Sequence, residues 1–374
     1  MLFLPAFVGN VKGQVTTLSV QPNPAYIYLN GSNTITLDLY VTAAVNLQSC
    51  DIYIAYDPEI LHLTSWAHGN FLVQPIMVFG GDVDAVPGYF YIPKNVTLPA
   101  PALIVLHEWG GPMLFGADRI CGDPVHPAIV KHREGTTSSR PLADWFASNG
   151  YAVIVIDAFH FGKRAPRGIY GLPETYDPEK LDEDTFEKYH NLAREALYYG
   201  VRQLNWAGTT WAGVNFGDDS RCVDYLLSRK EVDGTRIGCT GLSGGGWRTN
   251  MIAALEPRVK ATATVGWMTT GDTQQAYNLS GAVGTFCLLP GVWDRLDIPD
   301  MISMAAPKAC MVVGGTEDLL FPPTGQKEAV RQIAESYNWA GKPDLFRSYS
   351  PAKPHCYDKE IQEEAIKWFD KHLK

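Results

Sequence analysis

This sequence of 374 residues has little of what marks several large classes of protein. It has no basic excess, because 31 Lys and Arg residues stand against 40 Asp and Glu residues and the formal net charge is −9. Nucleic acids and anionic membrane surfaces attract basic patches, so neither is an expected partner. No apolar run approaches the roughly 18 residues that a membrane-spanning helix needs. The sequence therefore predicts a protein that has no membrane span and binds no nucleic acid.

Cysteine is sparse and follows no pattern. The seven cysteines form no C-x-x-C pair and no zinc-finger spacing, and their odd number suggests thiols with at most one or two disulfides. Cys121, His126 and His132 come nearest to a ligand set, but their spacing fits no common metal site. We expect no metal, and the redox compartment stays open.

What the sequence does contain is enough apolar material for a large core. Hydrophobic residues make up 46% of the chain and charged residues 19%, which is typical of ordered globular proteins. Residues 15–75 alternate apolar and polar side chains with period two between turn signals, which predicts antiparallel strands. Residues 1–14 are apolar at first and lack a basic start. They fit either a signal-peptide remnant, which we favour, or a first strand. The remnant implies a secreted or cell-surface protein, and without it a cytoplasmic one.

From residue 76 to residue 374 the pattern changes to short apolar runs that alternate with amphipathic helical segments. Strands are predicted at 87–93, 102–111, 151–159, 236–241, 260–267 and 309–318, and helices at 141–150, 185–206, 218–228, 244–254 and 360–374. A polar insertion covers 112–139. Such alternation predicts an α/β fold with a mostly parallel central sheet covered by helices, preceded by the small antiparallel β segment. Ligands of such sheets bind at the carboxyl ends of the strands.

One strand-to-helix turn carries a candidate nucleophile. Gly241-Leu242-Ser243-Gly244-Gly245 follows an apolar run and precedes a predicted helix, which is the context of a G-x-S-x-G nucleophile elbow. A serine hydroxyl becomes a nucleophile when a histidine takes its proton and a carboxylate orients that histidine. The alternative is a serine in a structural turn.

Both partners follow Ser243 in the chain. Asp318 ends the run CMVVGGTED, with Glu317 as a rival acid, and His355 lies in a loop between the last strand and the last helix. A turn-forming aspartate and a surface histidine are the alternatives for these two residues. The order Ser, Asp, His is that of the α/β-hydrolases.

Residues 80–374 therefore resemble an α/β-hydrolase serine esterase, closest to the dienelactone-hydrolase and acetyl-xylan-esterase branches. The loop His107-Glu108-Trp109-Gly110-Gly111 matches the position where these families keep an oxyanion donor. The resemblance implies that the backbone N–H groups of Trp109 and Gly244 form the oxyanion hole and that no cofactor is needed. His107 and Glu108 would shape this loop or the pocket. Dienelactone hydrolases usually carry cysteine at the elbow, so the serine here favours ordinary ester hydrolysis.

The segment LQSCDIYIAYDPEILHLTSW resembles the opening strands of cohesin-like β-sandwich modules through its Y-D-P-x-x-L turn. The resemblance covers less than half of such a module. A partial sandwich exposes sheet edges, so we expect residues 15–75 to pack on the neighbouring domain, to pair with another subunit in a homo-oligomer, or to be partly disordered.

Substrate-pocket candidates are mostly aromatic. Glu108, Trp247, Trp267 and Met268 are the main candidates, followed by Phe286 and Trp293. Packing in the core is the alternative for at least half of them.

Three functions remain open. The leading one is a carboxylic-ester hydrolase acting through an acyl-enzyme, on a small-molecule or polymer ester such as an acylated carbohydrate or an aromatic ester. The second is a serine peptidase of the same fold, which usually appends a propeller or a large cap. The third is a non-catalytic cohesin-like binding or scaffold protein.

Overall fold

The computed structural model describes residues 85–277 and 288–374, residues 283 and 285, and the backbone of the strands within residues 2–79. These residues divide into two compact units, Met1–Leu63 and Thr64–Lys374.

The first unit contains pairs of antiparallel strands. β1 (Leu2–Phe3) pairs with β4 (Tyr26–Ile27), β2 (Val8–Gln14) with β6 (Val45–Tyr53), and β3 (Thr17–Gln21) with β5 (Asp38–Thr42). Strand β2 lies in the segment that we interpreted as a signal remnant, and this pairing matches the alternative of a first strand. The Y-D-P-x-x-L turn lies outside the described residues.

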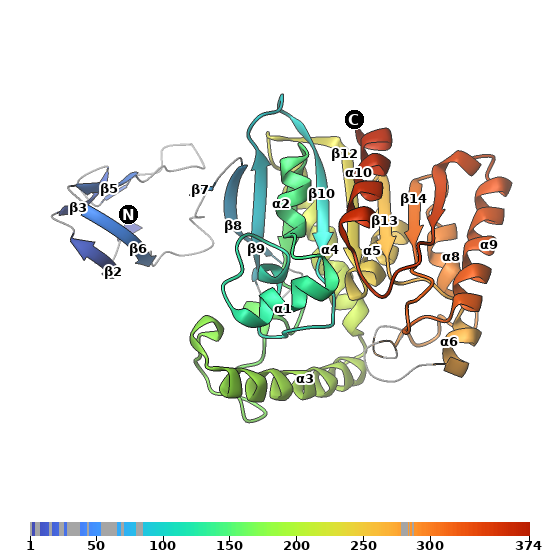
Figure 1. The fold of residues 1–374 in the computed structure, drawn as a ribbon, viewed down its shortest axis with the longest axis horizontal. Coiled ribbons are helices and arrows are strands. Elements are labelled where there is room, and N and C mark those ends of the chain that lie inside the picture. Colours follow the sequence, from blue (N-terminus) through green and yellow to red (C-terminus); the bar gives the residue numbers. More distant parts are fainter. Residues whose placement is uncertain are drawn as a thin grey trace. The chain divides into compact units, whose positions relative to one another are not determined.

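The second unit is built on a nine-stranded sheet with the order β15-β14-β13-β12-β10-β11-β9-β8-β7 (Figure 1). Its strands are β7 (Trp66–His68), β8 (Phe71–Phe79), β9 (Ala85–Pro93), β10 (Ala100–Leu106), β11 (Ala152–Ile156), β12 (Val232–Leu242), β13 (Ala261–Val265), β14 (Ala309–Val313) and β15 (Phe346–Tyr349). Strands β10, β11, β12, β13, β14 and β15 run parallel to one another, whereas β9, β8 and β7 join by antiparallel pairing. The predicted mostly parallel α/β sheet is confirmed.

Helices cover both faces of this sheet. They are α1 (Pro127–Thr136), α2 (Leu142–Ser148), α3 (Glu183–Trp206), α4 (Trp211–Leu227), α5 (Gly244–Leu255), α6 (Gly271–Tyr277), α8 (Ile298–Ser303), α9 (Pro323–Trp339) and α10 (Lys359–Leu373). Helices α2 and α10 pack on one face, where Leu103 and Val105 of β10 point. Helices α4 and α5 pack on the other, where Ile104 and Leu106 of the same strand point.

This two-sided burial explains why the parallel strands are continuous apolar runs rather than alternating ones. All seven residues of β10 are buried, and so are all five of β14. Burial of each large apolar side chain contributes about 1.5–3 kcal/mol relative to exposure. The central strands are therefore held rigidly, and the loops at their carboxyl ends start from fixed positions.

The helices differ from the sequence prediction in three places: one begins earlier than predicted, and two were not predicted. Helix α4 begins at Trp211 rather than near residue 218, α1 lies inside the segment 112–139 that we treated as a polar insertion, and α9 was not among the predicted helices. Helix α1 has a weak amphipathic pattern, because Arg133 and Ile129 are both among its buried residues. The polar composition of this segment is why the helix was not predicted.

The boundary between the two units lies between Leu63 and Thr64, whereas the sequence pattern changes near residue 75. Strand β8 begins at Phe71 and pairs along its whole length with β9, so it belongs to the main sheet. An antiparallel strand of the main sheet carries the same two-residue periodicity as a sandwich strand. Periodicity alone therefore could not tell to which sheet this strand belongs.

We predict that a chain beginning at Thr64 keeps the cooperative thermal unfolding of the second unit, because the two units are separately compact. A chain that begins after Phe79 should unfold at a Tm lower by about 5 °C or more, because β9 loses its antiparallel partner and becomes an exposed edge. Circular dichroism melts of the two truncated chains test this. Equal Tm values would contradict the assignment of β8 to the main sheet.

Candidate active site

Ser243 lies at the junction between β12 and α5. Its backbone has φ 56° and ψ −117°, a left-handed region that non-glycine residues rarely adopt. Two hydrogen bonds hold this turn: Ser243 N donates to Val265 O at 2.8 Å, and Trp247 N donates to Ser243 O at 2.9 Å. The serine therefore sits in a strained strand-to-helix turn, as the elbow motif requires.

The glycines beside Ser243 are explained by close backbone contacts. A Cβ atom on Gly245 would lie 2.0 Å from Leu106 O, and one on Gly246 would lie 2.5 Å from Val265 O. Any side chain at either position would overlap a neighbouring strand. The elbow is thus wedged between the carboxyl ends of β10 and β13, and the loops that follow those two strands must flank Ser243.

Asp318 lies in the turn after β14 and is buried. Its Oδ2 accepts a hydrogen bond from His355 Nδ1 at 2.6 Å, and its Oδ1 accepts one from Leu320 N at 2.8 Å. The rival Glu317 is exposed. The structure therefore brings Asp318 to the histidine.

His355 lies in the loop between β15 and α10. Its Nε2 has no hydrogen-bond partner among the residues that the structure describes. A Cβ atom on Gly266 would lie 3.0 Å from His355 Cε1, so the ring rests against the turn that follows β13. Because Ser243 N is bonded to the adjacent Val265, the serine and the histidine share this turn as a common neighbour.

The loop 107–111 follows β10, directly beside Gly245. His107 Nε2 accepts a hydrogen bond from Ala158 N at 3.0 Å, and its Nδ1 lies 2.9 Å from Glu108 O. Burial, together with the charge of Arg119, keeps the pKa of His107 well below its usual range. The same Nδ1 lies 2.6 Å from Arg119 Nη2, so His107 ties the loop both to Arg119 and to the end of β11.

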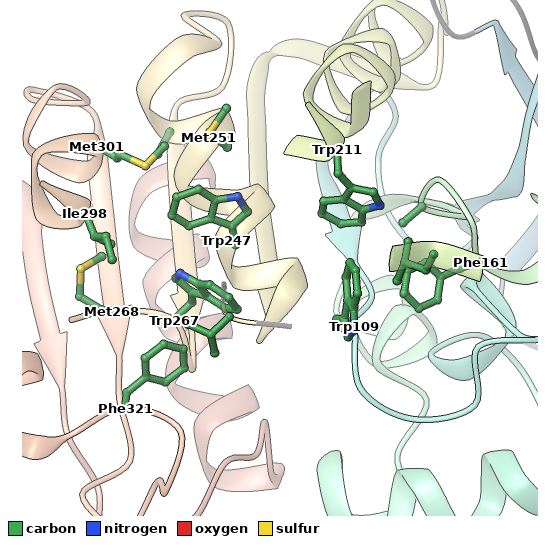
Figure 2. Packing of buried hydrophobic residues seen from close by; sticks show 14 of the residues in the cluster. Trp109, Phe161, Trp211, Trp247, Met251, Trp267, Met268, Ile298, Met301 and Phe321 are labelled. Carbon is green, nitrogen blue, oxygen red and sulfur yellow. The ribbon is translucent and has the colours of Figure 1, made fainter. Parts of the chain in front are cut away.

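The Trp109 ring anchors the same loop. It packs edge-on against Trp211 and Phe161, with centroid distances of 5.0 and 5.6 Å (Figure 2). The other predicted oxyanion donor, Gly244 N, belongs to the first residue of α5. Backbone N–H groups at a helix N-terminus lack intrahelical partners and favour negative charge. Both predicted donors therefore lie in backbone next to the elbow.

The Glu108 side chain is buried, and it is not among the residues that line the cavity of about 760 Å³ described below. Its carboxylate is buried and forms ion pairs with Arg119, at 3.5 Å, and with His132. Burial by itself would raise the pKa of Glu108, but the charge of Arg119 and the contact with His132 lower it below its usual range. Within the loop 107–111, Glu108 therefore balances the buried charge of Arg119.

The other three predicted pocket residues are buried as well. Trp247, Trp267 and Met268 belong to one packed cluster, in which the two indole centroids lie 5.6 Å apart (Figure 2). Phe286 lies outside the described residues.

A cavity of about 760 Å³ lies next to these side chains. Among its lining residues are Tyr198, Val201, Arg202, Gln275, Trp293 and Ile298. Tyr198 reaches the Trp109 ring, at 6.4 Å between centroids, and Trp293 reaches the Trp247 ring at 6.1 Å. The cavity thus adjoins the predicted oxyanion loop and the helix that follows Ser243. Most of its walls come from the segment 267–300, which the sequence indicates as a place for cap or pocket elements, with Trp293 as a named candidate. The walls from α3 were not predicted, because no local signal shows which face of that helix meets Trp109.

The histidines and the cysteine of segment 112–139 have separate partners. His126 accepts a hydrogen bond from Ala128 N at the start of α1, His132 pairs with Glu108, and Cys121 is buried in the core. Among the described residues no three His, Cys, Asp or Glu side chains gather as metal ligands do. No described helix is long and apolar enough to cross a bilayer.

The sheet order and the strand-to-helix elbow define an α/β-hydrolase fold. Residues 198–374 match the prolyl oligopeptidase family. A Bacillus subtilis (strain 168) protein named "Putative hydrolase YtaP" is 24% identical over 304 residues, which cover 81% of this chain and 88% of that protein.

Solved structures support the same fold. A "putative acetyl xylan esterase" of Bacteroides fragilis NCTC 9343 aligns with a TM-score of 0.57 and 16% identity, over 77% of this chain and 68% of that one. A glucuronoyl esterase from Solibacter usitatus aligns with a TM-score of 0.53 and 16% identity, over 85% and 87% of the two chains. Identities this low establish the fold alone.

Replacement of Gly245 by alanine should misplace the elbow, because the new Cβ would meet Leu106 O at 2.0 Å. We expect a loss of about 1–3 kcal/mol of stability and an activity lower by roughly 10²-fold, as small displacements of reacting groups cause. Urea unfolding and ester turnover measure both effects. Gly217→Ala is the matched control, since a Cβ on this exposed glycine of α4 meets nothing within 4 Å. Equal behaviour of the two variants would contradict the close approach.

Proposed function

We propose that this protein is a carboxylic-ester hydrolase with Ser243 as nucleophile, His355 as general base and Asp318 as the orienting acid. The observation that carries the proposal is the contact between the buried Asp318 carboxylate and the partly buried His355 ring, at 2.6 Å. It leaves the second ring nitrogen of His355 without a partner among the described residues, next to the turn that also holds Ser243. A base held in one tautomer beside a strained serine is the arrangement that acyl transfer requires.

The reaction proceeds in two steps. His355 Nε2 takes the hydroxyl proton as Ser243 Oγ attacks the ester carbonyl, and the tetrahedral oxyanion forms. Collapse breaks the bond to the alcohol, which leaves with the proton from His355, and the acyl group stays on Ser243. Water then attacks the acyl-enzyme with the same base, and the carboxylic acid is released with Ser243 restored. Asp318 stays ionised and stabilises the imidazolium.

The oxyanion would be stabilised by the N–H groups of Trp109 and Gly244. Both belong to backbone that packing holds rigidly, so they need no reorganisation as charge develops. In comparable sites, one such donor lowers the activation barrier by about 3–4 kcal/mol.

The substrate class we propose is an acylated carbohydrate or an aromatic ester. The cavity beside the site supports this, because the rings of Tyr198 and Trp293 give it flat apolar walls while Gln275 and Arg202 offer polar groups. Solved structures of similar fold include proteins named acetyl xylan esterase and glucuronoyl esterase.

A serine peptidase is the second candidate, and the match of residues 198–374 to the prolyl oligopeptidase family favours it. The same triad would cleave an amide through the same acyl-enzyme. Assays of matched ester and amide substrates side by side separate the two functions, and a higher kcat/KM for the amide would favour the peptidase.

Ser243→Ala should lower kcat for p-nitrophenyl acetate by at least about 10³-fold, because no other group can form the acyl-enzyme. Asp318→Asn should lower it strongly by losing the His355 orientation. Glu317→Gln serves as the matched control, since this exposed neighbour makes no contact with the histidine. Turnover that survives Ser243→Ala unchanged would overturn the proposal.

Trp293→Ala should raise KM for a sugar or aromatic ester about tenfold, because it removes an aromatic wall of the cavity. The change for p-nitrophenyl acetate should be smaller, since a small acyl group reaches less of the cavity. Trp339→Ala is the control, because this residue at the end of α9 is 92% exposed. Equal effects of the two substitutions would show that the cavity does not hold the substrate.

A further inference from the structure

A fully buried arginine lies directly under the loop 107–111. Arg119 ends a short 3₁₀ helix, Ala117–Arg119, and none of its surface is exposed. Its Nη2 donates to Glu108 O at 2.5 Å and its Nη1 donates to Gly110 O. One guanidinium thus holds the carbonyl oxygens of the two residues that flank Trp109.

These contacts determine the direction of the Trp109 N–H group. The Glu108 carbonyl and the Trp109 N–H belong to the same peptide unit, which is planar and trans, so they point in opposite directions. When Arg119 holds the oxygen on its own side, the N–H must point away from the guanidinium. The bond to Gly110 O holds the Gly110–Gly111 peptide, so the Trp109–Gly110 peptide lies between two peptides that Arg119 holds.

The charge of Arg119 is balanced inside the protein. The Glu108 carboxylate lies 3.5 Å from Nη1 and pairs in turn with His132. The guanidinium also lies 5.1 Å from the centre of the Phe161 ring, and that ring packs on the ring of Trp109. Trp109 is therefore held through its backbone by Arg119 and through its side chain by a ring that Arg119 contacts.

We infer that Arg119 is a positioning residue for the oxyanion hole, which it builds by fixing the Glu108–Trp109 peptide so that the Trp109 N–H faces the oxyanion. The inference rests on the proposed function. Arg119 touches no reacting atom. It acts through the carbonyl oxygens of Glu108 and Gly110 and through the His107 ring, whose Nδ1 lies 2.6 Å from its Nη2. A planar fork is needed because two carbonyl oxygens are held at once, which the single ammonium of lysine cannot reproduce.

The test compares two buried arginines of the same segment. Arg119→Lys should lower kcat about 10- to 100-fold with KM changed less than about threefold, because only transition-state stabilisation is lost. Arg133→Lys is the matched control. Arg133 is also buried and donates to four backbone carbonyls, those of Asp118, Arg119, Cys121 and Gly122, none of which lies in the loop 107–111. The Arg133→Lys variant should be less stable, while its kcat changes less than about threefold.

A second variant covers the outcome that Arg119→Lys does not fold. Glu108→Gln with Arg119→Met removes both charges of the buried pair, and such replacements leave many proteins stable. This double variant should fold and show the same loss of kcat. Glu108→Gln alone keeps the guanidinium on both carbonyls, so its kcat should be clearly higher than that of the double variant.

A boronic acid that forms a tetrahedral adduct with Ser243 provides a readout that a purely structural role would not move. Its affinity should fall by the same factor as kcat in the Arg119 variants and stay unchanged in Arg133→Lys. A kcat loss in Arg119→Lys no larger than in Arg133→Lys, or an unchanged boronate affinity, would overturn the inference. Failure of the proposed function would be recognised separately, because Ser243→Ala would then turn over the ester as fast as the unsubstituted protein.

Discussion

The close approach of three backbone segments at the elbow is the constraint on which the site depends. Gly245 touches the end of β10 and Gly246 the end of β13, at distances that leave no room for a Cβ atom. Ser243 is thereby held between two parallel strands, both buried and rigid. The loop 107–111 must then pass on one side of the serine. The turn at Gly266, with the His355 ring against it, must lie on the other. The site follows from this wedge rather than from contacts of the serine side chain.

Buried charge gives the surrounding loops their fixed directions. Arg119, Glu108 and His107 lie within the protein and bond mainly to backbone groups or to one another. Water screens such interactions little, and the loss of one partner leaves an unpaired charge that costs several kcal/mol. A loop held this way keeps one orientation. An oxyanion donor needs that property, since its stabilising effect depends on alignment before charge develops.

Much of the fold could be predicted because its signals are local. Parallel strands covered on both faces leave continuous apolar runs, so β10, β11, β13 and β14 were found close to their observed positions. Helices with an even apolar stripe, α3 and α10, were found as well. Helix α1 was missed because its buried face includes Arg133, which bonds to carbonyl oxygens instead of apolar groups. Strand β8 lies across the boundary predicted near residue 75, because its alternation does not show which strand it pairs with.

By itself, the sequence determined where the chemistry-bearing residues stand relative to the strands: Ser243 after β12, Asp318 after β14 and His355 after β15. Glycine spacing and apolar runs encode those positions within a few residues of chain. Only the tertiary structure decided which acid meets His355, which rings line the cavity, and that Glu108, Trp247, Trp267 and Met268 are interior residues. These outcomes depend on contacts between segments far apart in the chain, such as Tyr198 with Trp109. No local pattern carries that information, because a helix face is equally amphipathic whichever neighbour it meets.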